Sequence, residues 1–160
     1  MELTLDWGIT FAVIGALAAV ALGGIGSSIG CGRAGQKAAG VLAEKPHMFG
    51  KLSLMVALPG SQGVYGFLIA ILILLKIGAI GTGVEELTAQ KGMTLMIAGL
   101  ITGLTGLMSA MFQARAVSAS IGGLAKDESI MGGAITMSVI VETYAIFGLL
   151  ISILIWNSVN

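Results

Sequence analysis

The run Leu68-Ile69-Ala70-Ile71-Leu72-Ile73 recurs 82 residues later as Leu150-Ile151-Ser152-Ile153-Leu154-Ile155, and this repetition indicates the fold. Each run belongs to an apolar stretch of about 20 residues or more, the length that a helix needs to cross ~30 Å of hydrocarbon. Four such stretches occur, and the expected spans are about 9–32, 52–76, 92–115 and 131–156. Helix is the expected form of each, because backbone groups in lipid must be satisfied within their own segment.

The composition also favours an all-α membrane protein. The chain has 160 residues, of which 56% are hydrophobic and 10% are charged, whereas soluble domains carry about 25% charged residues. Its net charge is zero, so no basic face is expected to recruit nucleic acid. The single cysteine excludes an internal disulfide framework. Acidic residues, Glu2 and Asp6, precede the first apolar stretch, so we expect a retained span rather than a secretory signal.

The repeat divides the chain into two tandem helical hairpins, residues 1–78 and 79–160. Both copies enter and leave the membrane on the same side, so the repeat is parallel. The first helix of each copy carries small residues four apart, which let helix backbones approach closely. These rows are Gly15, Ala19, Gly23, Ser27 and Cys31 in the first copy and Thr102, Gly106, Ala110 and Ala114 in the second. Rows of this length suggest helices crowded around a narrow axis, as on the inner wall of a ring of identical subunits.

The charged residues predict the orientation of the hairpins. Six of the eight Lys and Arg residues lie in the expected connections 33–51 and 115–130. The positive-inside rule places these two connections in the cytoplasm, and both termini and the Glu85–Glu86 connection on the other side. Trp7 and Trp156 are then expected at the outer boundary, as interfacial anchors.

Apart from Lys76 and Arg115 at span ends, Glu142 is the only acid or base inside an expected span, in the sequence Ile140-Val141-Glu142-Thr143-Tyr144. An unpaired charge at that depth costs at least ~2.5 kcal/mol, so an intramembrane carboxylate is a functional candidate. The alternative is a protonated structural carboxyl group whose hydrogen bonds a neighbouring helix satisfies. The first copy has Gly60 at the aligned position, so only one acid is present for two hairpins.

Oxygen-bearing side chains surround the aligned position in the first copy. Pro59 is expected to kink its span and to leave the carbonyl group near Met55 without its helical partner. Ser61, Gln62 and Tyr65 follow at spacings of three and four, which place them on one helix face.

The third span adds Gln113, which we expect near its cytoplasmic end. With Glu142 these groups form an oxygen-rich set with one negative charge, which suits a hard monovalent cation. The alternative role of the neutral side chains is purely structural, namely hydrogen bonding that holds neighbouring helices together.

The sequences Leu58-Pro59-Gly60-Ser61-Gln62-Gly63-Val64-Tyr65-Gly66 and Val141-Glu142-Thr143-Tyr144-Ala145 resemble the proteolipid (K or c) subunit of V-type ATPases. The bacterial sodium-pumping form is the most similar, and the resemblance covers essentially the whole chain. It implies a multi-pass protein of the cell membrane that forms a rotor ring of identical subunits. That ring would turn against a membrane stator subunit while a separate soluble head hydrolyses ATP, so the chain itself would not be catalytic. The cytoplasmic loops would dock a central-stalk subunit.

The same resemblance implies a set of sodium ligands. These are the backbone carbonyl group of Leu58 and the side chains of Ser61, Gln62, Gln113 and Glu142, with Tyr65 hydrogen-bonded to the glutamate. A member of that family has threonine at the position of Ser61, and serine keeps the hydroxyl group.

Three other functions compete with a sodium-carrying rotor. The same rotor would carry H⁺ if the neutral side chains are purely structural. A small proton-coupled multidrug exporter would also have four helices and one membrane glutamate, but the parallel duplication and the low aromatic content, 6%, argue against it. A purely structural membrane protein would leave Glu142 without a role. The run Gly30-Cys31-Gly32-Arg33-Ala34-Gly35 matches a dinucleotide motif by letter, but it lacks the preceding strand that this motif requires.

Overall fold

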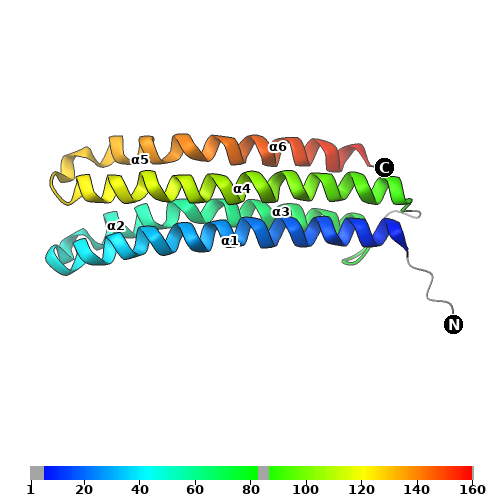
Figure 1. The fold of residues 1–160 in the computed structure, drawn as a ribbon, viewed down its shortest axis with the longest axis horizontal. Coiled ribbons are helices and arrows are strands. Elements are labelled where there is room, and N and C mark those ends of the chain that lie inside the picture. Colours follow the sequence, from blue (N-terminus) through cyan, green and yellow to red (C-terminus); the bar gives the residue numbers. More distant parts are fainter. Residues whose placement is uncertain (1–5, 83–86, 160) are drawn as a thin grey trace.

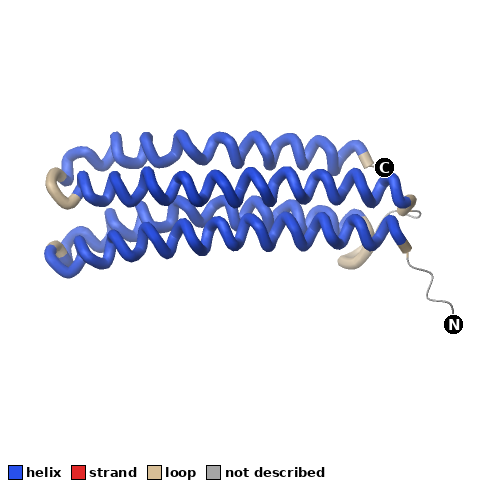
Figure 2. The backbone as a smooth tube through the Cα atoms, viewed as in Figure 1, coloured by secondary structure: helices blue, strands red, loops and turns tan. Residues whose placement is uncertain are grey.

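The structure is a computed structural model that describes residues 6–82 and 87–159, and in these residues it is helical throughout apart from short connections (Figures 1 and 2). Two spans are single helices, α1 (Trp7–Glu44) and α4 (Ala89–Leu124). The other two are broken, and consist of α2 (Phe49–Ala57) followed by α3 (Ser61–Lys76), and of α5 (Met131–Val139) followed by α6 (Thr143–Ser158). Within the described residues, four helical stretches are long and apolar enough to cross a membrane. The expected all-α architecture is therefore confirmed.

Helices α1 and α4 form the central pair, and small residues set their separation. Gly8 lies against Gly92, and Gly15 lies against Gly99. A methyl group added at Gly99 would come closer than 3.0 Å to the backbone of Gly15. The close approach expected from the small-residue rows is therefore present between the two copies.

The remaining helices lie on this pair. Helix α3 packs against both α1 and α4, and α6 packs against α4 and the edge of α3. The beginning of α1 and the end of α6 lie at one end of the bundle, and both hairpin connections lie at the other (Figure 1). Helix α3 therefore contacts both central helices, and Gln62 on its polar face is fully buried.

Ionic contacts join the two hairpin connections to each other. His47 Nε2 lies 2.7 Å from Glu128 Oε1, and Lys51 Nζ donates to Glu128 Oε2 at 2.8 Å. At the opposite end, Trp156 Nε1 donates to the carbonyl oxygen of Leu72 at 2.8 Å, and Lys76 Nζ lies 4.5 Å from the Trp156 ring centroid. Both ends of the bundle thus tie the first hairpin to the second.

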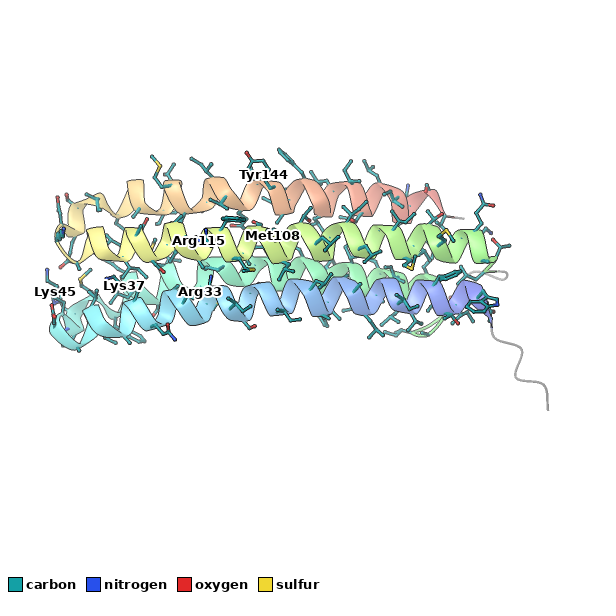
Figure 3. All side chains as sticks on the ribbon, in the orientation of Figure 1. Arg33, Lys37, Lys45, Met108, Arg115 and Tyr144 are labelled. Atoms are coloured by element: carbon teal, nitrogen blue, oxygen red, sulfur yellow. The ribbon has the colours of Figure 1, made fainter. Side chains whose placement is uncertain are left out.

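The helices are longer than the spans expected from the sequence. Arg33 and Lys37 belong to α1 and Arg115 belongs to α4, so most of the expected loops 33–51 and 115–130 is helix. The charged side chains are exposed (Figure 3), while apolar residues on the opposite face continue into the core cluster at this end. That cluster stabilises the helices past the point at which the first charge ends the apolar run. The Glu85–Glu86 connection lies outside the described residues.

Candidate ion-binding site

Each broken span contains a 3₁₀ turn, and the two turns occupy equivalent places in the repeat. One is Leu58–Gly60 and the other is Ile140–Glu142, again 82 residues apart. Pro59 accounts for the first turn, since it has no N–H group to donate. The carbonyl oxygen of Met55 has lost its helical partner, as expected, and accepts from the N–H group of Leu58 instead, because the chain tightens to 3₁₀ geometry there. The second turn has no proline, so the bend belongs to the repeated architecture and not to Pro59 alone.

Glu142 lies in the second turn and has hydrogen-bond partners from two other spans. Its side chain is 8% exposed. Tyr65 Oη on α3 donates to Glu142 Oε1 at 2.6 Å, and Gln113 Nε2 on α4 donates to Glu142 Oε2 at 3.3 Å. Among the residues that the structure describes, Glu142 is the only buried acid or base. We expected Gln113 near the cytoplasmic end of its span. It lies instead well inside α4, because α4 continues to Leu124, and its side chain is fully buried.

The remaining expected residues continue this network into the first turn. Gln62 Nε2 donates to Gln113 Oε1 at 2.6 Å. Ser61 Oγ lies 3.3 Å from Gln62 Oε1 and 3.1 Å from the carbonyl oxygen of Leu58, and donates toward both. Residues from all three spans are therefore joined in one polar cluster at the two turns. It contains a carboxylate, two amide carbonyl groups, a hydroxyl group and a backbone carbonyl group within one bundle.

Two further serines bond to the spans that contain the turns; the sequence had placed Ser27 in a row of small packing residues and had given Ser109 no role. Ser109 Oγ donates to the carbonyl oxygen of Val141 at 3.0 Å and accepts from Gln62 Nε2 at 3.2 Å. In the first copy, Ser27 Oγ donates to the carbonyl oxygen of Gly60 at 3.2 Å and accepts from the N–H group of Gly63 at 2.7 Å. The sequence signal was available, since Ser27 and Ser109 align in the repeat and each precedes a turn-bearing span.

The first hairpin has the bend and the serine but lacks counterparts of Glu142 and Gln113. Gly60 stands where the second copy has Glu142, and Cys31 stands where it has Gln113. A methyl group added at Gly60 would lie 3.5 Å from Cys31 Sγ, an ordinary contact. The first turn therefore contributes neutral oxygens to the site around Glu142 and has no carboxylate of its own.

Comparison with known proteins identifies the family. The family of ATP synthase C subunits matches the chain twice, over residues 14–73 and 96–155. The chain is 46% identical to A-type ATP synthase subunit K of Methanocaldococcus jannaschii over 142 residues, 89% of this chain and 60% of that protein. It is 36% identical to V-type sodium ATPase subunit K of Enterococcus hirae over 153 residues, 96% of this chain and 94% of that protein. It is 25% identical to the 16 kDa proteolipid of the human V-type proton ATPase over 145 residues, 91% and 90% of the two chains.

The two matched segments are displaced by the same 82 residues as the internal repeat, so the duplication is confirmed. The chain spans only 60% of the length of the archaeal relative but nearly all of the bacterial one. The resemblance to V-type proteolipids is likewise confirmed, and it leaves the multidrug exporter without support. With its four spanning stretches, the protein is a multi-pass membrane protein. The chain belongs to the family of ATP synthase C subunits, and within it to the proteolipid subunits of V- and A-type ATPases.

Proposed function

We propose that this chain is a non-catalytic rotor-ring subunit of a V/A-type ATPase, and that it carries one Na⁺ per subunit at Glu142. The observation that carries this proposal is the joining of Glu142 to neutral oxygen-bearing groups from three spans in one buried network. Residues 1–78 and 79–160 would each supply one hairpin, and together they would form one site.

The proposed ligands suit sodium by their chemistry. A sodium ion that enters the membrane must replace the oxygens of the water it sheds, and hard cations prefer carboxylate, amide and carbonyl oxygens. The donors are the carbonyl oxygen of Leu58, the side-chain oxygens of Ser61, Gln62 and Gln113, and the carboxylate of Glu142. A proton would need the carboxylate alone. The sodium ATPase named among the relatives supports sodium, while the more distant proton ATPases keep H⁺ as the alternative ion.

Neutralisation of Glu142 by the bound ion explains how an occupied site could face lipid while the ring rotates. The charge of the ion cancels the carboxylate of Glu142, so a loaded subunit avoids the cost of an unpaired charge at the bilayer centre. The ring would turn against a stator membrane subunit, which supplies the ion with a path to each side. One acid for two hairpins also means few ions per turn. Since moving one charge against 100 mV costs ~2.3 kcal/mol, such a ring is suited to pumping against steep gradients.

The basic residues support the proposed orientation. Arg33, Lys37, Lys45 and Arg115 all lie in the half of the bundle that contains the hairpin connections (Figure 3). This half would face the cytoplasm of a cell membrane, and both termini would face the other side. The exposed connections around Lys45 and Asp127 would then dock the central-stalk subunit.

Equilibrium binding of radiolabelled sodium to the purified ring tests the proposal. We expect one ion per subunit near neutral pH, and much weaker binding after Gln113→Ala or Ser61→Ala. Ser152→Ala is a matched control, because Ser152 Oγ donates from α6 to the carbonyl oxygen of Ala98 on α4, away from the network. Absence of sodium binding to the unaltered ring, or unchanged affinity in both site variants, would make H⁺ the better assignment. A dimer in place of a large ring in mild detergent would contradict the rotor itself.

A further inference from the structure

We infer that Ser109 is a positioning residue that sets the orientation of the side-chain amides of Gln62 and Gln113. It thereby keeps the side-chain carbonyl oxygen of Gln62 directed toward Ser61 and the other proposed ion ligands. This inference rests on the proposed sodium site and names a residue that the ligand set does not contain. It concerns the direction of the hydrogen bonds, which follows from the chemistry of the groups at each end of the network.

The carbonyl oxygen of Val141 sets the direction at one end. A carbonyl group only accepts, so Ser109, 3.0 Å away, must use its hydroxyl proton there. Ser109 Oγ is then left with lone pairs toward Gln62, 3.2 Å away, and only the NH₂ end of that amide can donate to them. The opposite end of the amide, Oε1, therefore faces Ser61.

The same direction passes on to the second amide. The NH₂ group of Gln62 has two protons, and it donates the second to Gln113 Oε1 at 2.6 Å. The NH₂ end of Gln113 is thereby turned toward Glu142 Oε2 at 3.3 Å. An ionised carboxylate favours this direction too, but a protonated one can donate and loses that constraint. The carbonyl group of Val141 accepts whether Glu142 is ionised or protonated. Ser109 therefore constrains the orientation of the Gln62 amide in both charge states of Glu142.

The burial of these amides makes the direction of their hydrogen bonds important for ion binding. Gln62 and Gln113 are fully buried and Ser109 is 5% exposed, so a donor that loses its partner here is costly to leave unpaired. Without the Ser109 hydroxyl group, one N–H bond of Gln62 has no acceptor, and when Glu142 is protonated the two amides can turn together, which directs the NH₂ group of Gln62 toward Ser61. A cation would then meet N–H protons in place of the carbonyl oxygen.

Sodium binding to the purified ring of Ser109→Ala tests this role. We expect a dissociation constant about tenfold higher, equivalent to 1.4 kcal/mol, with the same number of sites per subunit. Ser109→Thr restores the hydroxyl group, and its added methyl group has room in the apolar groove beside Ser109 that Met108 and Tyr144 also line. We expect that variant to bind within about twofold of the unaltered ring. Ser152→Ala, which removes another buried bond between α6 and α4, should also leave affinity unchanged.

The outcomes separate this inference from the proposed function. No sodium binding to the unaltered ring overturns both. Sodium binding that is equally tight in Ser109→Ala overturns the role of Ser109 and leaves the sodium site standing. Fewer sites at unchanged affinity in Ser109→Ala, or equal weakening in Ser152→Ala, would indicate loss of folded protein and would also overturn the positioning role. Weakened affinity with a full number of sites, restored by Ser109→Thr, supports it.

Discussion

Replacing Tyr65 by phenylalanine removes one hydroxyl group from the site and changes little else. Tyr65 Oη donates to Glu142 Oε1 at 2.6 Å, the short distance typical of an O–H donor on a charged acceptor. The phenol stabilises the ionised carboxylate, which is the form that binds a cation. Its removal should therefore weaken sodium binding and leave the ring assembled.

The size of the effect follows from the kind of hydrogen bond that is lost. Hydrogen bonds to charged groups contribute ~1.5–3 kcal/mol net, which corresponds to a roughly 10- to 150-fold higher dissociation constant for sodium. Tyr65 is partly buried and Glu142 is 8% exposed, so water has limited access to replace the lost donor. We therefore expect an effect within that range and not below it.

The chain offers a matched control in its only other tyrosine. Tyr144 is 67% exposed, and its ring lies edge-on to Phe147 at 6.3 Å. Radiolabelled sodium binding and sodium protection of Glu142 against carbodiimide labelling would be compared for Tyr65→Phe and Tyr144→Phe. Only Tyr65→Phe should need more sodium for half-maximal binding and protection. Equal affinity in the two variants would refute the view that the phenol supports the binding-competent carboxylate.

Three further substitutions test the carboxylate, the copy number of the site and the packing. Glu142→Gln should abolish ion transport by reconstituted complex while the ring still assembles, and transport at the normal rate would contradict its role. Gly60→Glu should leave one sodium per subunit by direct counting, because the first hairpin has Cys31 where the second has Gln113; two bound ions per subunit would contradict this expectation. Gly99→Ala should cost ~1–3 kcal/mol by overpacking against Gly15, seen as ring dissociation at lower temperature. Gly40→Ala, where the added methyl group would meet no other helix of the subunit within 4 Å, should not share this loss.

Several features of the site could be predicted from residue type and spacing in the sequence. Glu142 stood out because burying a carboxylate in lipid is costly, and that holds wherever the helix packs. Ser61, Gln62 and Tyr65 were assigned to one helix face from their spacing alone, which is a local property of the helix. The structure joins all three to Glu142, Tyr65 directly and Ser61 and Gln62 through Gln113.

The errors arose where local patterns were taken as helix limits. The span containing Gln113 was ended at the first charges, although apolar contacts on the far face of α4 continue the helix to Leu124. Pro59 does remove the helical partner of the Met55 carbonyl group, as expected, but the replacement donor, the N–H group of Leu58, was not foreseen, because the shift to 3₁₀ bonding is a response of the whole backbone turn. The second 3₁₀ turn at Ile140–Glu142 had no proline to reveal it.

The four spans, the duplication and the identity of the acid could all be predicted from the sequence, because each depends on hydrophobic length, on self-similarity or on the cost of one buried charge. The tertiary structure alone decided which groups surround that acid and in which direction their hydrogen bonds run. Gln62 and Glu142 are far apart along the chain, and they share a network only because small residues bring α4 close to α1 and α3. Ser109 shows the difference most clearly. In the sequence it is only the residue that aligns with Ser27 in the repeat, whereas the contact with the carbonyl group of Val141 sets the direction of its hydroxyl group and, through it, the direction of the neighbouring amides.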